Sequence, residues 1–440
     1  MEVYYDLSRL VERLAGSVPS GIDRIDLHYA LWTRACASRW IGVLQRPWGV
    51  EFLDEAYSAS LLDGLRRRWI GDEVGEGVEG SLRQPPGWRR EARAAILEKV
   101  ARAPYCSRVS GRSLLATPPI FLPKLTKKLL LMGQMRARQH DQVSSAGAYW
   151  NIGHNFRFER AAEVIAETWS SRSFLFLHDV IPLLYPETQR EVSRLHFLRF
   201  CQWTTKLDAQ LIVSSQSTVA EIERLEGAGF ALFGRQINSV IQMPLPVESR
   251  FFDTKHAPHR PISEVPFFLI IGTWEKRKNL NILLDVWEQL ASERGKKIVL
   301  KWVGKRDGMS RKAIARLERL KRDGWIEELG GVSDQTIKEL FADARALLFP
   351  SLAEGWGLPL AEALAAGLPV IASDLPICRE VSQGLAEYQN PSDCSQWIVS
   401  VKEFAGLDSS LRLAQLERVQ SYQLQLWEAY FDQLADRLKP

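Results

Sequence analysis

Short apolar runs alternate with amphipathic segments throughout the second half of the sequence, and this alternation restricts the possible folds most. Such runs are typical of strands buried in a parallel sheet, and the amphipathic segments between them are typical of helices covering that sheet. The pattern therefore predicts a doubly wound α/β domain. We expect strands at 267–271, 298–303, 346–349 and 369–372, and helices at 279–290, 310–320, 333–344 and 358–366.

The first half shows a weaker form of the same alternation. The stretch 71–123 is rich in glycine, proline and arginine and receives no assignment. Prolines recur between 244 and 266, which is typical of a linker. We expect strands at 3–7, 173–177 and 210–213, and helices at 217–225 and 422–438. The expected division is a first domain over 1–245, a second over 246–420 and a helix within 421–440.

Composition and charge exclude several classes of protein. Of the 440 residues, 46% are hydrophobic and 25% charged, which is enough apolar material for two cores. The net charge of +4 indicates no general affinity for polyanions. The five cysteines lie far apart, which predicts free thiols and no zinc site. Neither a signal peptide nor an apolar run of about 18 residues is present, so we expect a cytoplasmic protein.

The segment 350–362 carries the densest chemical signal. Gly355 and Gly357 let the backbone approach a ligand, and the helix expected to start near Leu358 offers unpaired N–H groups to a diphosphate. Glu354 and Glu362 are separated by seven residues, and carboxylates accept hydrogen bonds from sugar hydroxyls. A capped helix with two solvated glutamates explains this segment equally well when it is taken alone.

Two adjacent cations, Arg277 and Lys278, follow the strand that ends at Gly272. They are expected at the ligand-binding edge of the sheet, where they can neutralise a departing nucleoside diphosphate. The chain contains no Asp-x-Asp triplet of the kind that holds a metal on the diphosphate. The alternative without a catalytic role is that the two cations simply begin a helix. The helix dipole disfavours positive charge at that position.

These segments together resemble the E-x7-E signature of the retaining glycosyltransferases of family 4, also called group 1. The segments 331–334, 346–351, 362–373 and 379–381 follow in the family's order, and the resemblance covers at least 267–391. It implies the GT-B fold, in which two doubly wound, Rossmann-like domains face each other across a cleft and a C-terminal helix crosses back. The donor is then expected in the second domain and the acceptor in the first.

By this resemblance Glu354 contacts the donor sugar and Glu362 the nucleotide ribose. Where other members carry an arginine after the glycine, this chain has Thr273, so Arg277 is taken as the second cation beside Lys278. The other expected donor-binding residues are Gly21, Gly272, Gly355, Trp356, Gly357, Leu358 and Val332.

The first half contributes a segment that looks like the family's His-Asp-x-Ile-Pro motif. It begins at His178, which the resemblance places beside the donor sugar. A lone histidine at a strand end is more often structural. Asp179 follows His178, and Asn151 and His154 lie in the segment 149–155, which looks like a strand end facing the cleft. We expect all three on the acceptor side.

The predicted function is the retaining transfer of a hexose, with mannose as the first choice, from a GDP- or UDP-linked donor. The sugar is transferred to a glycan or to a lipid-linked molecule in cell-surface polysaccharide biosynthesis. Neither a metal nor a resident cofactor is expected. The alternatives are an inactive, membrane-docked partner subunit, a GT-B sugar phosphorylase and, less favoured, a nucleotide-sugar epimerase.

The segment 86–138 contains twelve Lys or Arg residues and two Glu residues. Basic residues interleaved with leucines are typical of a helix on an anionic membrane surface, and equally of a solvated basic face. A peripheral position on the inner face of the plasma membrane is therefore one of two expectations for this segment. Binding to nucleic acid is not expected, because no recognised nucleic-acid-binding module is present.

Overall fold

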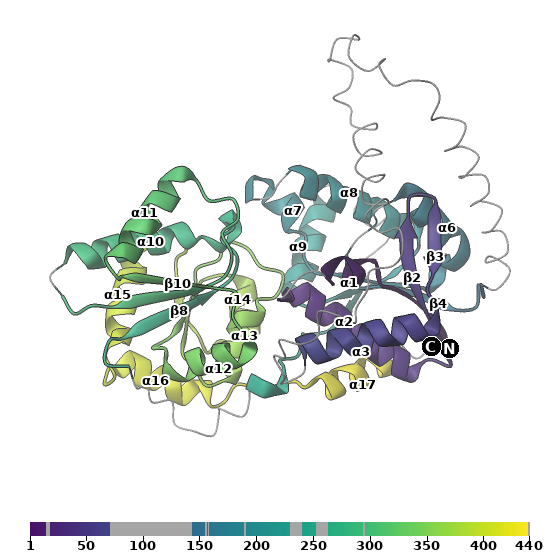
Figure 1. The fold of residues 1–440 in the computed structure, drawn as a ribbon. Coiled ribbons are helices and arrows are strands. Elements are labelled where there is room, and N and C mark those ends of the chain that lie inside the picture. The colour runs from purple at the N-terminus through teal and green to yellow at the C-terminus, as the bar shows by residue number, and fades with distance from the viewer. Residues whose placement is uncertain are drawn as a thin grey trace, which may run out of the picture.

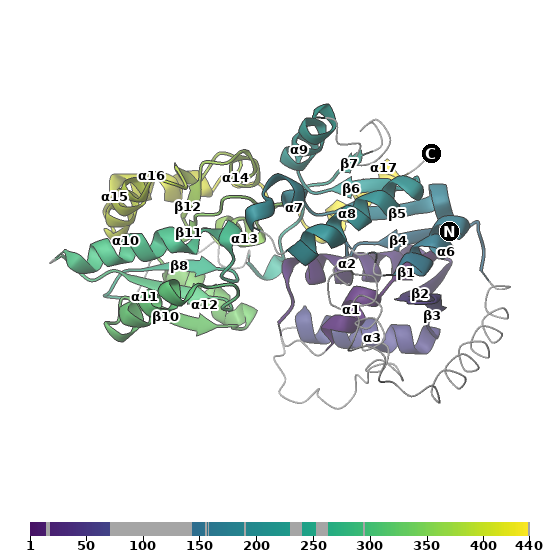
Figure 2. The same ribbon diagram turned by 90° about the horizontal axis from the view of Figure 1, so that it is seen from above.

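The computed structural model describes residues 1–14, 18–70, 143–154, 156, 158–188, 191–228, 240–251, 263–293 and 295–438. Within them the chain forms two α/β domains side by side, each with one sheet between helices (Figures 1 and 2). The basic segment 86–138 and most of the proline-rich linker, 252–262, lie outside the described residues. None of the described helices combines the length and the apolar character that crossing a membrane requires.

The first domain is built on a sheet in the order β3-β2-β1-β4-β5-β6-β7. All neighbours are parallel except β2 and β3, which form an antiparallel pair at one edge. The strands are β1 (Glu2–Asp6), β2 (Arg39–Arg46), β3 (Gly49–Phe52), β4 (Ala148–Asn151), β5 (Ser173–Leu177), β6 (Gln210–Val213) and β7 (Val240–Gln242). The helices are α1 (Ser8–Arg13), α2 (Gly21–Cys36), α3 (Glu55–Trp69), α6 (Glu159–Trp169), α7 (Ile181–Leu184), α8 (Glu191–Lys206) and α9 (Gln216–Gly227).

The second domain has an entirely parallel sheet in the order β10-β9-β8-β11-β12-β13. Its strands are β8 (Phe267–Ile271), β9 (Val299–Val303), β10 (Ile326–Gly330), β11 (Leu347–Phe349), β12 (Val370–Ser373) and β13 (Glu387–Gln389). Its helices are α10 (Leu280–Ser292), α11 (Arg311–Arg322), α12 (Asp334–Asp343), α13 (Leu358–Ala365), α14 (Pro376–Val381), α15 (Cys394–Ala405) and α16 (Ser410–Val419). In both sheets the strand order reverses once, and ligands of such sheets bind at the carboxyl edge beside the reversal.

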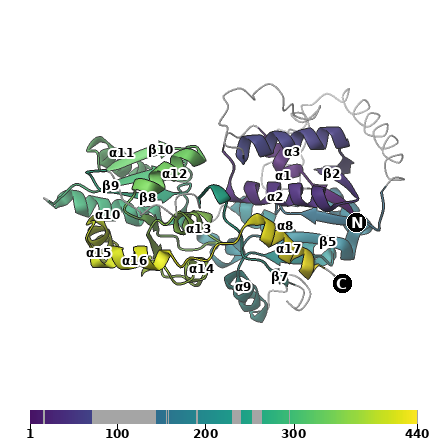
Figure 3. The same cartoon turned by 90° about the horizontal axis from the view of Figure 1, so that it is seen from below.

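The last helix, α17 (Trp427–Arg437), returns to the first domain as expected (Figure 3). Its Tyr430 hydroxyl lies 2.5 Å from the Tyr29 hydroxyl of α2, and Phe431 stacks on Trp32 with 4.8 Å between ring centroids. The helix begins at Trp427 rather than at 422, because residues 422–426, which cross between the domains, form no helix. There the Gln425 carbonyl accepts a hydrogen bond of 3.3 Å from the Val247 N–H of the other crossing.

The strands and helices expected in the second half are confirmed to within a few residues. The sequence pattern did not predict β10 and β13, which lie at the two edges of the sheet and are only partly buried. In the first domain, β2, β3 and β7 were likewise not predicted. The boundaries at 245 and 420 stay predictions.

Candidate active site at the domain interface

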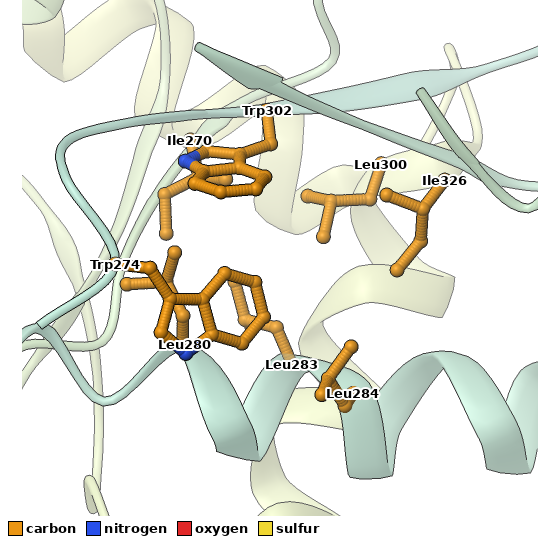
Figure 4. A pocket seen from close by; sticks show the side chains of 8 residues that line it. All are labelled: Ile270, Trp274, Leu280, Leu283, Leu284, Leu300, Trp302 and Ile326. Atoms are coloured by element: carbon orange, nitrogen blue, oxygen red, sulfur yellow. The ribbon is translucent and has the colours of Figure 1, made fainter. Parts of the chain in front are cut away.

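Two tryptophans, Trp274 and Trp302, support the loop that follows β8. The Trp302 indole N–H donates a hydrogen bond of 2.8 Å to the Gly272 carbonyl, and Trp274 packs edge-on against Trp302 with 5.0 Å between centroids. A Cβ atom on Gly304 would lie 1.9 Å from the same carbonyl oxygen, so only glycine fits there. Figure 4 shows both indoles lining a small apolar cavity between the sheet and α10. The support fixes the loop that carries the two predicted cations.

Arg277 and Lys278 hold the Glu354 carboxylate between them. Arg277 Nη1 lies 2.8 Å from Glu354 Oε2, and Lys278 Nζ lies 2.6 Å from Oε1. The Ser351 hydroxyl donates a third hydrogen bond, of 2.6 Å, to Oε1. The Leu352 N–H also donates to the Arg277 carbonyl at 2.7 Å, so the two loops are joined by backbone as well. The structure thus brings three predicted site residues into one buried cluster.

The electrostatics of this cluster keep the carboxylate ionised. Burial alone would raise the pKa of Glu354, but the adjacent Lys278 and Arg277 together lower it to about 2. Burial opposes the charge of Arg277, yet its carboxylate neighbours raise the pKa of the guanidinium overall. For Lys278 burial is the stronger effect, and it lowers the ammonium pKa against the attraction of Glu354. Because Lys278 donates to an ionised carboxylate at 2.6 Å, we treat it as protonated.

The turn after Glu354 reaches into the first domain. A Cβ atom on Gly355 would lie 2.2 Å from the His178 carbonyl oxygen, so only glycine allows this approach. The hydroxyls of Ser214 and Ser215 each donate to the Gly355 carbonyl at 3.3 Å. Gly357 has φ +102° and precedes α13 without a side-chain cap, as expected for a helix start that offers its N–H groups. The half-buried Trp356 side chain packs against the cores of both domains.

His178 lies at the carboxyl end of β5 and is uncharged. Its Nε2–H donates a hydrogen bond of 2.9 Å to the Ile152 carbonyl, which leaves Nδ1 as an acceptor. Burial lowers the pKa of His178 to about 3. His154 lies beside it, with 5.7 Å between ring centroids, and packs edge-on against Phe200. Burial also lowers the pKa of His154, so both of these neighbouring rings are neutral at neutral pH.

The two other predicted acceptor-side residues occupy different environments. The Asp179 carboxylate accepts a hydrogen bond of 3.0 Å from the Ile181 N–H; burial raises its pKa, and the charge of Arg277 opposes that rise. Asn151 is fully buried, and its Nδ2 lies 3.5 Å from Asp6 Oδ2 and 3.4 Å from the Tyr149 hydroxyl. Asp179 therefore lies near the charged cluster, whereas Asn151 lies inside the first domain.

Glu362 lies in α13 and faces the start of α2. It is 8% exposed, and burial raises its pKa to about 7 although Arg24 opposes that rise. Gly21 is the first residue of α2, and a Cβ atom there would lie 2.8 Å from Leu358 Cδ1. Val332 is half-buried in front of α12. The predicted nucleotide side of the site therefore also lies at the contact between the domains.

Comparison with known proteins identifies the domain that carries the cluster. Residues 251–385 match the family model described as "Glycosyl transferases group 1". This part of the chain is therefore similar to the group 1 glycosyl transferases. The chain is 28% identical over 228 residues to "O-antigen chain mannosyltransferase B" of Escherichia coli, covering 50% of this chain and 58% of that protein. It is 30% identical over 253 residues to "Serotype-specific mannosyltransferase WbdA" of Escherichia coli, covering 52% of this chain and 29% of that protein.

The whole chain shares its fold with solved glycosyltransferases. It superposes on WaaG, a glycosyltransferase involved in lipopolysaccharide biosynthesis, with a TM-score of 0.58 and 15% identity over 100% of both chains. The expected GT-B fold is therefore confirmed, and the match to the group 1 model lies in its second domain.

Sequence reasoning missed two interdomain contacts of the group 1 domain. Asp334 bonds Arg24 of α2 at 2.5 Å and Arg250 at 2.8 Å. Glu380 of α14 accepts hydrogen bonds from the Ser217 N–H at 2.9 Å and the Ser217 hydroxyl at 2.7 Å, at the start of α9. Asp334 and Glu380 both lie in segments that carry the family resemblance. A local sequence pattern does not indicate which residue of the other domain is the partner.

Proposed function

We propose that this protein is a retaining glycosyltransferase that moves a hexose, with mannose as the first choice, from a GDP- or UDP-linked donor. The acceptor is a glycan or lipid-linked acceptor of cell-surface polysaccharide assembly. The observation that carries the proposal is the Glu354 carboxylate held between Arg277 and Lys278 where the group 1 domain meets His178. The mannosyltransferases among its relatives support the choice of sugar.

The first role belongs to the cations. Cleavage of a sugar–phosphate bond leaves charge on the diphosphate, and fixed Arg and Lys side chains stabilise such charge strongly in a buried site. Arg277 and Lys278 each have N–H donors beyond those that Glu354 occupies. In this proposal they serve the departing diphosphate without a metal ion.

The second role belongs to Glu354. Its oxygens accept three short, mostly charge-assisted hydrogen bonds, which makes it a weak nucleophile. It is better suited to orienting the sugar and stabilising positive charge at the anomeric carbon. Retention then arises because the departing phosphate oxygen accepts the acceptor's proton on the same face. A trapped glycosyl–Glu354 adduct, or an inverted product, would contradict this route.

The third role belongs to the first domain. His178 is neutral and presents Nδ1 as an acceptor, so it orients a sugar hydroxyl and does not act as an acid near pH 7. The contact of Gly355 with His178 brings the two faces together, and closure of this kind limits hydrolysis of the donor.

A donor screen tests the proposal. Purified protein is incubated with GDP-mannose, UDP-glucose, UDP-galactose, UDP-GlcNAc or GDP-fucose in EDTA, and release of the nucleoside diphosphate is followed. Glu354→Gln and Lys278→Met should abolish the release. Glu288→Gln is the matched control, because Glu288 of α10 pairs with Arg316 of α11 at 2.6 Å, outside the cluster.

Three outcomes would overturn parts of the proposal. Release only with a divalent metal would contradict the role of the cations. Phosphate-dependent formation of a sugar 1-phosphate would indicate a phosphorylase. Absence of both donor binding and release, with membranes added as an acceptor source, would indicate an inactive partner subunit.

A further inference from the structure

The start of helix α9 in the first domain is bonded by α14 of the second domain, which lies beside it (Figure 3). Glu380 of α14 accepts hydrogen bonds from the Gln216 N–H at 2.6 Å, from the Ser217 N–H at 2.9 Å and from the Ser217 hydroxyl at 2.7 Å. The third N–H of the helix, that of Thr218, donates to the Ser215 hydroxyl oxygen at 3.0 Å. Because the first N–H groups of a helix have no partner within it, two of those of α9 depend on a carboxylate of the other domain.

Of the described hydrogen bonds between the start of α9 and the second domain, those to Glu380 are the shortest. Hydrogen bonds to a carboxylate are roughly twice as strong as those between neutral groups, and the dipole of α9 also favours negative charge at its first turn. The hydroxyls of Ser214 and Ser215, by contrast, donate to the Gly355 carbonyl at 3.3 Å, beyond the usual range of about 2.5–3.0 Å for O–H···O bonds. Glu380 therefore determines where the start of α9 lies against the second domain.

The position of this helix start also affects the candidate active site. Strand β6, which precedes α9, pairs in parallel with β5, whose carboxyl end carries His178, so the segments after the two strands lie side by side. Both segments touch Gly355: the Ser214 hydroxyl donates to its carbonyl, and a Cβ atom on it would lie 2.2 Å from the His178 carbonyl oxygen. Because this approach leaves no free space, a shift of α9 against the second domain would also move His178 relative to Glu354.

We propose that Glu380 is a positioning residue for the transfer reaction. By bonding α9 across the domain interface, it fixes the start of this helix against the second domain and so fixes the distance between His178 and Glu354. Among the described residues it bonds neither of these two side chains, and it acts on them through α9. The inference rests on the proposed function, because it requires a reaction whose groups come from both domains.

The test separates turnover from donor affinity. Release of the nucleoside diphosphate from each donor of the screen, with GDP-mannose first, is measured for the full chain and for Glu380→Ala, Glu380→Gln and Asp374→Asn. Glu380→Ala should lower kcat about tenfold and leave KM within about twofold, because a displaced helix misaligns the reacting groups without removing a donor contact. Glu380→Gln keeps one oxygen as an acceptor and should recover part of the loss. Asp374→Asn is the matched control and should retain kcat, since Asp374 pairs with Arg379 of its own domain at 2.6 Å.

A double-mutant cycle shows whether Glu380 acts through α9. Ser217→Ala removes the hydroxyl that donates to Glu380 at 2.7 Å and keeps the backbone N–H bonds, so it should lower kcat only about two- to threefold. Added to Glu380→Ala, it should cause no further loss, because the two groups then no longer interact.

Three results would overturn the inference. Unchanged kcat per folded molecule in Glu380→Ala, with only a lower thermal midpoint, would mean that the contact is purely structural. A higher KM at constant kcat would mean that Glu380 contacts the donor, and additive losses in the cycle would mean that it does not act through α9. Each of these results leaves the proposed function intact, whereas failure of the wild type to bind or release any nucleoside diphosphate overturns both.

Discussion

Two buried regions hold ionisable groups in opposite charge states: the Glu354 cluster of the second domain, called the charged face, and the region of Asp26 and His178 in the first domain, called the neutral face. In the second domain, Glu354 lies between two cations and its pKa falls to about 2. In the first domain, burial raises the pKa of Asp26 to about 8, although a hydrogen bond from Tyr5 opposes the rise. His178 is neutral for the same reason, since burial lowers its pKa to about 3.

The difference follows from where the arginines bond. Arg277 bonds Glu354, whereas Arg9, which lies near Asp26, bonds Asp23 at 2.7 Å instead. Burial penalises charge on both faces, and only a directly bonded cation reverses the penalty. The charged face is suited to a diphosphate and the neutral face to sugar hydroxyls.

The largest expected effect comes from removing the charge of the second face. Glu354→Gln removes the carboxylate between Arg277 and Lys278 and, of their ion pairs within the described residues, leaves only that of Glu275, 3.0 Å from Arg277 Nε, so donor turnover should fall about 100-fold or more. The free energy of unfolding should also fall by about 3–5 kcal/mol. Addition of a nucleoside diphosphate should restore part of the thermal midpoint, because its charge replaces the lost carboxylate. Turnover within tenfold of wild type would show that the ionised Glu354 carboxylate of the charged face is not required for the reaction.

The second effect comes from separating the two faces. Gly355→Ala places a Cβ atom 2.2 Å from the His178 carbonyl, so the domains cannot approach as closely. Turnover should fall about 100-fold, as expected for a misplacement of about 1 Å. Gly227→Ala, where a Cβ atom meets nothing within 4 Å, is the control. Small-angle scattering should show a more open molecule in Gly355→Ala alone, and an unchanged profile would contradict this explanation.

The third effect is a pH dependence that belongs to the neutral face. Because folding raises the pKa of Asp26 from 3.8 to about 8, its contribution to stability is complete below pH 4 and is lost as the pH rises to 8. Asp26→Asn keeps an acceptor for the Tyr5 hydroxyl, which lies 2.8 Å from Oδ1, and cannot ionise. Relative to wild type, it should gain about 3–4 kcal/mol between pH 5 and pH 8. Urea unfolding at both pH values measures the gain, and a loss at pH 8 would mean that Asp26 is ionised.

The smallest expected effect comes from the support under the charged face. Trp302→Phe removes the hydrogen bond to the Gly272 carbonyl, so stability should fall by about 1 kcal/mol and turnover about fivefold. Trp287→Phe also removes a buried indole hydrogen bond, of 3.1 Å to Ile298, but away from the loop. It should cost similar stability without the loss of turnover, and equal turnover in both variants would show that the support does not position the cations.

The same comparison explains how much the sequence alone could predict. The second domain was assigned well because its central strands are continuous apolar runs, and its Glu354 cluster joins segments that each show a pattern of their own. Asn151 shows the limit of such reasoning, because a polar residue at a strand end looks alike whether it faces a ligand or lies in the core. Arg24 and Asp334 are 310 positions apart, so their contact depends on domain packing that local periodicity does not report.

The return of α17 to the first domain also has a consequence for protein synthesis. Tyr430, Phe431 and Leu434 belong to the core that includes Tyr29 and Trp32 of α2. The ribosome makes every strand of both sheets before it makes this helix, so the first domain emerges with an aromatic surface uncovered. The second domain therefore folds while its neighbour is still incomplete, and the nascent chain is most exposed to aggregation and to chaperones during that interval.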